Sequence, residues 1–404
     1  MLQVSGTRTE HWSKTEKVLT DDAVEISVVI PCLNEANSVG ICVQKACKAF
    51  RSAGLKGEVI VADNGSTDGS QEIAQNHGAR VVPVPQRGYG AALQAGIRAS
   101  RGQFIVMGDA DDSYDFAEVP KFVSKWREGH DVVMGNRFLG EIKPGAMPWH
   151  HKYIGNPGLT AVLNLFFRTG IGDSHCGMRG FSREVFDRMD LRSTGMEFAS
   201  EFVIKASQLG AKISEVPIVL WQDKRGRPPH LRSFRDGWRH LRFMLLYSPT
   251  WLFLLPGVLL LLIGTAFGAR LQMGSWKVGP FGFDTNTMLV CSMCQVVGLQ
   301  IFFFGIFTRV FAISEGLLPK TASPLDRIYK WFTLERGVLL GLVIFLVGLA
   351  KLSMAVLSWK AAYFGAMSYP ESLRQVIPAV TLITVGVQVI FSSFFLSILS
   401  LPRK

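Results

Sequence analysis

The sequence predicts an α/β domain with a mostly parallel sheet, followed by an all-α membrane domain of four transmembrane helices. Three observations support this fold class. Short β-branched runs alternate with helical segments over residues 24–230. Four long apolar runs with almost no charge follow residue 249. Arginines gather just before the first of these runs, as is typical of a cytoplasmic membrane face.

The soluble elements are expected in strict alternation. Strands are expected at residues 26–30, 58–62, 80–84, 104–108 and 131–135. Helices are expected at residues 38–53, 67–77, 90–100 and 119–128, with Gly54 and Gly78 as stop signals for the first two. This alternation predicts parallel strands with helices on both faces, and ligands bind at the carboxyl ends of such strands.

Four apolar segments are expected to span a membrane, at residues 251–269, 288–313, 338–357 and 378–401. A single segment of this length could be a buried core helix, but four in series indicate a multi-pass membrane domain over residues 249–404. Lys and Arg are richer before the first span, between the second and third, and at the C-terminus. These parts, including the N-terminal domain, are therefore expected in the cytoplasm.

The segments around the main domain are polar or amphipathic. Residues 1–23 are expected to be disordered, and they show no signal peptide. Residues 231–248 are expected to form a juxtamembrane amphipathic helix, lying on the membrane or packed on the soluble domain. A second such segment is expected at 325–332. The net charge of +11 is concentrated next to an apolar span, so we expect a membrane partner and no nucleic acid.

The cysteines do not indicate a metal or disulfide framework. Six are scattered along the chain, and the pair Cys291 and Cys294 lies within an apolar helix, where packing is expected. Scattered thiols agree with a reducing, cytosolic environment for the soluble domain.

An acidic motif, Asp109-Ala110-Asp111-Asp112, directly follows the apolar run 104–107. Three carboxylates so close together repel one another unless a cation lies between them. Hard oxygen ligands with little room for a full protein cage suit Mg²⁺ or Mn²⁺, with substrate phosphates completing the shell. The alternative is a solvated loop with an Asx turn.

Two further polar motifs follow the first two strands. Pro31 begins a segment that ends in Asn34-Glu35, and Asp63 begins a segment rich in Asn, Gly, Ser and Asp that ends at Ser70. A carboxylate at the end of a strand suits hydrogen bonds to a base or ribose. Helix capping is the alternative, and Ser66 or Thr67 could supply it.

These three motifs together resemble those of family-2 glycosyltransferases of the GT-A fold, over residues 24–220. With the trailing spans, the chain resembles the branch that uses polyprenyl phosphates, which includes dolichol-phosphate mannose synthases. The resemblance implies inverting transfer of a hexose from a nucleotide-sugar donor, of the UDP-glucose or GDP-mannose class, to undecaprenyl or dolichyl phosphate at the cytoplasmic membrane face. It also makes a homo-oligomer plausible.

The resemblance implies roles for matching positions. The nucleotide-sugar pocket would be lined by Pro31, Asn34, Glu35, Asp63, Asp109 and, in the loop 86–92, Gly88. Asp111, with Asp109 beside it, would ligate Mg²⁺ or Mn²⁺ at the diphosphate. Arg137 would pair with a phosphate, although a surface ion pair is its alternative.

On the acceptor side, residues 174–183 resemble a motif of this branch, so Arg179 or Arg183 would bind the acceptor. Arg225 and Arg227 would hold lipid headgroups, the acceptor phosphate or the donor diphosphate. The resemblance leaves open the roles of three acidic residues, which are Asp112, Glu197 and Glu201.

Other functions were weighed against this one. A processive polysaccharide synthase of the same fold carries Gln-x-x-Arg-Trp, but here Gly226 follows Arg225. An enzyme acting on another lipid, as sphingolipid glucosyltransferases do, stays open. A non-catalytic membrane partner also stays open, although the intact acidic motif argues against it.

Overall fold

The computed structural model describes residues 24–224, 233–315 and 333–400, and the chain within them forms two compact units. The first unit contains residues 24–154, 171–199 and 211–224. The second contains residues 155–170, 200–210, 233–315 and 333–400. The boundary between the units therefore differs from the one expected near residue 230. Residues 155–170 and 200–210 lie within the α/β sequence but belong to the second unit.

The first unit is built on a seven-stranded sheet of order β3-β2-β1-β4-β6-β5-β7, and the α/β alternation is confirmed. Every strand runs parallel to the others except β6, which is antiparallel to both of its neighbours. Five strands match the expected ones: β1 Ile26–Cys32, β2 Gly57–Asp63, β3 Arg80–Pro83, β4 Phe104–Met107 and β5 Val132–Ile142. Beyond these five lie β6 Arg179–Ser182 and β7 Ile213–Leu220.

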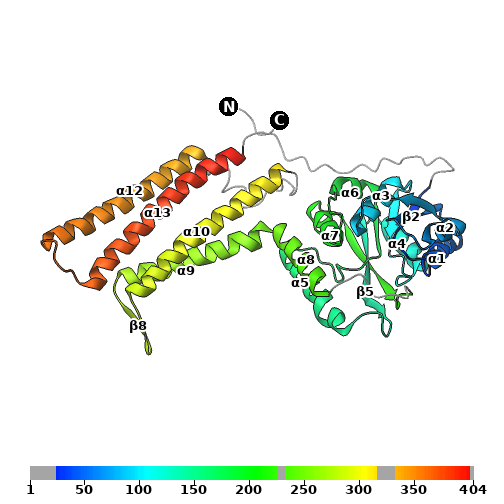
Figure 1. Ribbon diagram of the computed structural model, residues 1–404, viewed down its shortest axis with the longest axis horizontal. Coiled ribbons are helices and arrows are strands. Elements are labelled where there is room, and N and C mark those ends of the chain that lie inside the picture. Colours follow the sequence, from blue (N-terminus) through cyan, green and yellow to red (C-terminus); the bar gives the residue numbers. More distant parts are fainter. Residues whose placement is uncertain (1–23, 225–232, 316–332, 401–404) are drawn as a thin grey trace. The chain divides into compact units, whose positions relative to one another are not determined.

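Helices cover both faces of this sheet (Figure 1). α1 Val39–Ala53 and α4 Val119–Arg127 pack on one face, where alternate β1 residues such as Val28 and Ile30 join their core cluster. α3 Tyr89–Ala99 packs on the other face, where Gly96 lies against Val29 and Ala62. Shorter helices are α2 Ser70–Asn76 and α6 Arg183–Met189. The alternation along β1 is the period-two pattern of a strand buried on both faces.

The register of the sheet brings the sequence motifs to one edge. β1 and β2 are parallel and pair Cys32 with Asp63, while β4 ends beside β1 at Met107. Because β6 runs the other way, its first residue, Arg179, pairs with Met107 and its last, Ser182, pairs with Phe104. Residues just before Arg179 therefore reach the carboxyl ends of the parallel strands, whereas residues after Ser182 lie at the opposite edge.

The second unit contains the four expected spans, and each is confirmed as a helix long and apolar enough to cross a membrane. The first span joins η3 Thr250–Leu254 to α9 Leu255–Gln272, and a β-hairpin, β8 Trp276–Val278 with β9 Phe281–Phe283, links it to the second. The other spans are α10 Thr285–Ser314, α12 Leu334–Ala361 and α13 Tyr369–Leu399. Three of these helices run several residues beyond the expected ends, because flanking polar residues continue the helix.

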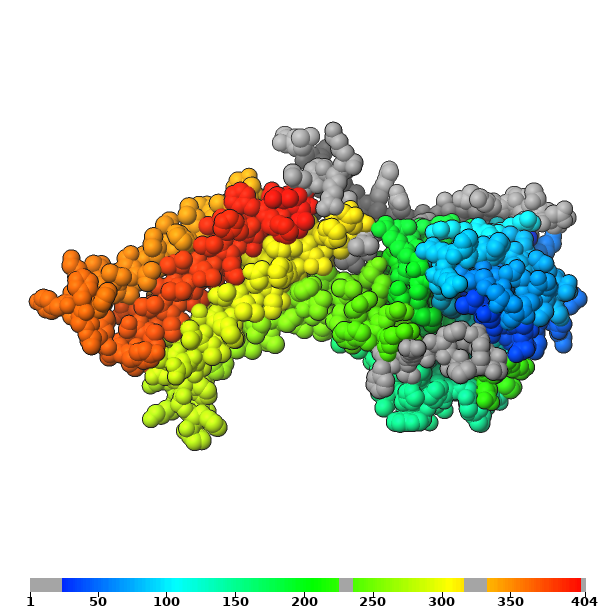
Figure 2. Space-filling model, viewed as in Figure 1, coloured from blue at the N-terminus to red at the C-terminus, as the bar shows by residue number. Residues whose placement is uncertain are grey.

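Close helix contacts in the membrane domain depend on small residues. A Cβ on Gly298 would lie 2.9 Å from the Gly257 carbonyl oxygen, and one on Gly386 would lie 2.7 Å from that of Gly341. Small residues of this kind allow membrane helices to approach closely. Many large side chains of α12, in the orange part of Figure 2, are exposed and not packed against other helices. They include Leu339, Leu346, Met354 and Leu357. This exposure is what a lipid-facing helix requires.

Helices of the second unit also include α5 Asn156–Phe167, most of α7 Phe198–Gln208, and α8 Ser233–Leu246. α8 confirms the helix expected near residues 231–248, but it buries polar Asp236 and His240, and the exposed fraction of the Trp238 side chain is 60%. The 1–23 and 325–332 segments lie outside the described residues, as do Arg225 and Arg227.

Candidate active site

The loops after β1 and β2 are joined by hydrogen bonds at the carboxyl edge of the sheet. The backbone N–H of Asn34 donates to Ser66 Oγ at 2.8 Å, and the Thr67 N–H donates to Asn34 Oδ1 at 2.8 Å. Glu35 follows the same pattern, because its N–H donates to Ser70 Oγ at 2.9 Å. Asn34 holds this geometry with φ of +56°, a left-handed conformation that Asn tolerates better than most residues. The two loops therefore form one rigid wall.

Asp63 organises that wall from within. Its carboxylate accepts the N–H groups of Gly65 and Ser66, both at 3.0 Å, and the side-chain amide of Gln71 at 2.6 Å. The carboxylate is almost fully buried. Asp63 Oδ2 therefore forms an Asx turn with the residues that follow it. Oδ1, whose bond to Ser66 is the longer one at 3.3 Å, is the atom left to meet a base.

The loop before α3 is tied to the same wall. The Gly88 N–H donates to Asn64 Oδ1 at 2.7 Å. A Cβ on Gly88 would lie 2.2 Å from the Thr194 carbonyl oxygen, and the φ of Gly88 is +138°. Both facts require glycine. The close approach expected of Gly88 is thus made to the protein backbone at Thr194.

Asp109 lies at the end of β4 between two tyrosines. The Tyr89 hydroxyl, at the start of α3, donates to Asp109 Oδ1 at 3.0 Å. Tyr114 accepts the Gly177 N–H at 2.9 Å, and a Cβ on Gly177 would lie only 2.7 Å from Asp109 Oδ2. Burial raises the pKa of both phenols well above the usual value, so Tyr89 stays protonated and remains a donor. The antiparallel turn of β6 is what brings Gly177 to Asp109.

Asp111 is buried two residues further on. Its Oδ1 accepts the Ser113 N–H at 3.0 Å and the Ser113 hydroxyl at 2.6 Å. The Asx-turn alternative therefore describes its local geometry, which does not exclude a metal at the other oxygen. Over the described ranges, no group of three His, Cys, Asp or Glu side chains is arranged to hold a metal ion. The pair Asp109 and Asp111 fits Mg²⁺ or Mn²⁺ only as a partial ligand set that water and substrate phosphates complete.

Asp112 has a different environment from its neighbours. Its Oδ1 lies 2.7 Å from Lys45 Nζ on α1, and its Oδ2 lies 2.7 Å from Lys224 Nζ after β7. Both oxygens of the carboxylate are therefore engaged by ammonium groups. The role of Asp112, which the sequence left open, is therefore to form ion pairs with Lys45 and Lys224.

Arg137, on β5, forms a buried pair with Asp173. Its Nε donates to Asp173 Oδ2 at 2.7 Å and its Nη2 to Oδ1 at 2.8 Å. The ion pair that was the alternative is therefore present, although it is buried and bidentate and does not lie on the surface. A phosphate contact by Arg137 would have to use Nη1.

Arg179 and Arg183, which the resemblance assigns to the acceptor, both contact backbone carbonyl oxygens. Arg179 is fully buried, and its guanidinium donates to the carbonyl oxygens of Cys176, Ala199 and Ser174. Arg183 donates to backbone carbonyls of Gly102, Ile97 and Ser100, beside the start of β4. Both arginines satisfy buried backbone oxygens, which is a structural task.

The other candidate acids are also engaged in structural contacts. Glu201 forms the helical ion pair with Lys205 that its spacing predicts, at 2.9 Å and fully buried. His175 lies 2.9 Å from Ser174 Oγ, as expected for a hydrogen-bonded loop histidine. Glu197 remains without an assigned role.

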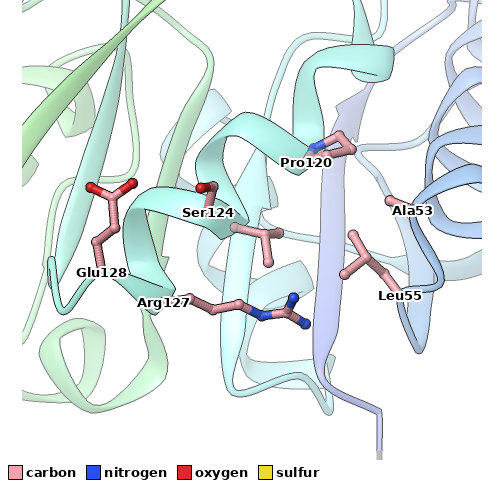
Figure 3. Close-up of a pocket in the computed structure, with 7 residues that line it drawn as sticks. Ala53, Leu55, Pro120, Ser124, Arg127 and Glu128 are labelled. Atoms are coloured by element: carbon pink, nitrogen blue, oxygen red, sulfur yellow. The ribbon is translucent and has the colours of Figure 1, made fainter.

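A cavity of about 350 Å³ opens on the same domain but away from these residues (Figure 3). It lies between α1 and α4, near the amino ends of β1 and β2, and is lined by Ala53, Leu55, Pro120, Val123, Ser124, Arg127 and Glu128. Arg127 there pairs with Glu25, just before β1. This cavity is at the sheet edge opposite the acidic motif and is not the candidate site.

Sequence reasoning missed several residues that build the site. Tyr89 and Asp173 are the main ones. A signal was present for Tyr89, because it lies in the glycine-rich loop before α3. No local signal identifies Asp173, whose partner is 36 residues away in sequence. Lys224 begins the basic loop expected to bind phosphates, but its pairing with Asp112, 112 residues away, has no local signal.

A mostly parallel α/β domain with two carboxylates at the end of a central strand, on a chain with four spanning helices, defines a membrane-integral enzyme of the GT-A glycosyltransferase class. Comparison with known proteins agrees. Residues 27–190 match the model for glycosyl transferase family 2, and residues 306–400 match that for the family-2 C-terminal transmembrane region. The chain belongs to glycosyltransferase family 2.

Relatives extend over most of the chain. The low-salt glycan biosynthesis hexosyltransferase Agl6 of Haloferax volcanii is 39% identical over 394 residues, covering 96% of this chain and 92% of that protein. A dolichyl-phosphate hexose transferase of the same organism is 32% identical over 197 residues, covering 48% of this chain and 82% of that protein. The expected enzyme class, glycosyltransferase, is confirmed.

Among solved structures, a glucosyl-3-phosphoglycerate synthase from Mycobacterium tuberculosis in complex with Mn²⁺, UDP-glucose and phosphoglyceric acid is similar in fold. Its TM-score is 0.45 at 23% identity, covering 55% of this chain and 78% of that chain.

Proposed function

We propose that this glycosyltransferase transfers a hexose from a nucleotide sugar to a polyprenyl phosphate at the cytoplasmic membrane face. The observation that carries the proposal is the position of Asp109 and Asp111 at the end of a central strand in a chain that also spans the membrane. One molecule then carries a site for a charged, water-soluble donor and also spans the membrane that contains the lipid acceptor. The name of the dolichyl-phosphate hexose transferase relative supports this reading.

The donor side is assigned to the carboxyl edge of the sheet. Asn34, Glu35 and the Asp63 loop form the wall for the nucleotide, and Asp109, held by Tyr89, faces the ribose or sugar. Asp111, with Asp109, would hold Mg²⁺ or Mn²⁺, which when bound would neutralise charge on the leaving diphosphate. Pro31 closes β1 at the base of this wall.

The proposed reaction inverts the anomeric centre. A phosphate oxygen of the acceptor forms a bond to the anomeric carbon as the bond from that carbon to the donor diphosphate breaks, and the nucleoside diphosphate leaves. The attacking oxygen is already ionised at neutral pH, so no side chain has to remove a proton from it. The task of the protein is then to orient the two phosphates and exclude water.

The composition of one stretch of the chain also supports a membrane-bound acceptor. Residues 142–172 contain Lys143, Lys152 and Arg168 and no Asp or Glu. Within this stretch Trp149 and Tyr153 are each 68% exposed. Aromatic and basic side chains together are typical of a surface that meets anionic headgroups. We assign this stretch, with Arg225 and Arg227, to the acceptor side.

The proposal is tested by a transfer assay in membranes that contain the full-length protein. Polyprenyl phosphate is offered with a panel of UDP- and GDP-sugars, with and without EDTA. We expect one hexose to be transferred, and we expect EDTA or Asp111→Ala to abolish the product. Transfer only to another lipid would favour the sphingolipid-type alternative. Metal-dependent turnover in Asp111→Ala would contradict the metal assignment.

A further inference from the structure

Asp112 is a buried carboxylate paired with two partly exposed lysines. Its side chain is 2% exposed, and its two oxygens each lie 2.7 Å from an ammonium nitrogen, of Lys45 and of Lys224. The backbone of Asp112 is left-handed, with φ of +61°, which turns its side chain differently from those of its neighbours. A buried carboxylate is costly unless it is paired, and here both oxygens are paired.

The segment after β7 is attached to the acidic motif by its backbone as well. The Trp221 N–H donates to the Ser113 carbonyl oxygen at 2.9 Å, and the Lys224 N–H donates to that of Asp111 at 3.0 Å. Tyr114 also forms a bridge with Leu220 at the end of β7. The chain therefore runs alongside the acidic motif for several residues, and the Asp112–Lys224 pair closes this attachment.

The Lys45 pair fixes the other side of the motif. Lys45 lies on α1, which packs on the sheet, and it is also 3.6 Å from Asp115. Asp112 thus connects the acidic motif to a packed helix and to the strand-end segment 221–224. Moving Asp112 would displace the Asp111 carbonyl, because Lys224 contacts both residues.

We propose that Asp112 is a positioning residue and not a metal ligand, and that Lys45 and Lys224 hold it so that Asp111 keeps its orientation. The proposal rests on the proposed function, in which Asp111 binds the metal. Asp109 and Asp111 then bind the cation, and Asp112 forms ion pairs with the two lysines. This division of roles explains how three neighbouring carboxylates remain ionised in one buried loop.

The first test measures metal binding without turnover, by titrating detergent-solubilised full-length protein with Mn²⁺ in the presence of UDP and, separately, of GDP. We expect Asp111→Asn to weaken Mn²⁺ binding at least about ten-fold, since it removes a charged ligand. We expect Asp112→Asn to weaken Mn²⁺ binding by a smaller factor, about three-fold, since Asp112 orients Asp111 but does not contact the cation. Equal losses in the two variants would overturn the proposal.

The second test is a double-mutant cycle on the transfer reaction. Asp112→Asn and Lys224→Met should each lower kcat with little change in the KM for the donor, and their combination should be less than additive because they share one interaction. Lys125→Met on α4, which removes a surface pair with Glu128, is the matched control and should leave kcat unchanged. Strictly additive losses would contradict the coupling.

Two measures keep the tests decisive. If Asp112→Asn fails to fold, Lys45→Met and Lys224→Met carry the same prediction, since each removes one partner and leaves the carboxylate. If the wild type transfers no hexose to polyprenyl phosphate, the proposed function fails, but the Mn²⁺ titration still separates the roles of Asp111 and Asp112.

Discussion

The Tyr89 hydroxyl donates a hydrogen bond to Asp109 Oδ1 at 3.0 Å and thereby joins the start of α3 to the end of β4. The two residues are 20 positions apart in sequence and come from neighbouring parts of the carboxyl edge. The bond fixes one oxygen of Asp109, so the orientation of the other is fixed too. Tyr89 is therefore expected to act on the donor through Asp109.

Tyr89→Phe should lower kcat/KM for the nucleotide sugar about ten- to hundred-fold, because a hydrogen bond to a charged group contributes about 1.5–3 kcal/mol. Its fold should persist, because the ring is retained. Steady-state kinetics in membranes would measure the loss. Tyr363→Phe, at an exposed position, is the control and should leave kcat/KM unchanged. A wild-type kcat/KM in Tyr89→Phe would show that the bond does not position Asp109.

Alkaline titration should separate Tyr89 and Tyr114 from the other five of the seven tyrosines. The pKa of each is raised well above its usual value, chiefly by burial. The stability that these neutral phenols contribute is therefore present below the unfolded pKa, about 10, and is lost as pH rises through the folded pKa. Phenolate absorbance should show a group of tyrosines that ionise at high pH, together with unfolding. Tyr89→Phe should reduce the number of tyrosines in this group by one. Simple titration of all tyrosines near pH 10 would contradict the structure.

Gly177→Ala should impair activity more than stability. The added methyl group would lie 2.7 Å from Asp109 Oδ2 and 3.0 Å from the Tyr114 ring, so one of them has to move. We expect kcat to fall at least about ten-fold, the usual scale for a displaced site residue. Gly237→Ala, on α8 with open space around the position of an added Cβ, is the matched control. Equal kcat in the two variants would mean that Asp109 tolerates displacement.

Arg183→Met should lower thermal stability and leave the KM for the lipid acceptor unchanged. The substitution strands the carbonyl oxygens of Gly102 and Ser100, which now accept from the guanidinium, at a cost of about 1–3 kcal/mol for each buried group left unpaired. A thermal melt and an acceptor titration would separate the two effects. A raised acceptor KM with an unchanged melting temperature would restore the acceptor role expected from the sequence.

Local patterns were sufficient to predict β1 to β5 and the four spans. β1 is a run of apolar residues closed by Pro31, and α1 repeats apolar residues every three or four positions. β6 was not predicted, because Arg179-Gly180-Phe181-Ser182 is short, carries a charge and contains a glycine. Only its place between β4 and β5 makes it a strand. A buried arginine satisfied by carbonyls cannot be distinguished in sequence from one that binds phosphate.

The candidate site was predicted in part for a similar reason. Asp109 and Asp111 follow a strand directly, so their position can be inferred from local sequence. The partners that set their roles come from distant segments: Tyr89 from α3, Gly177 from the segment before β6, and Lys224 from the end of β7. Such contacts depend on strand order and direction, which local periodicity does not specify.

The division of the chain into two units has a practical consequence for protein production. Residues 155–170 and 200–210 belong to the same unit as the spans, so no single cut separates a complete soluble enzyme from the membrane helices. A fragment ending before residue 233 would keep α5 but lose α8 and Trp251, against which α5 and Phe166 pack. Apolar side chains such as Leu163, which is fully buried, would then face water. α8 and Trp251 thus complete the packing of α5, and we expect truncations that end before residue 233 to aggregate.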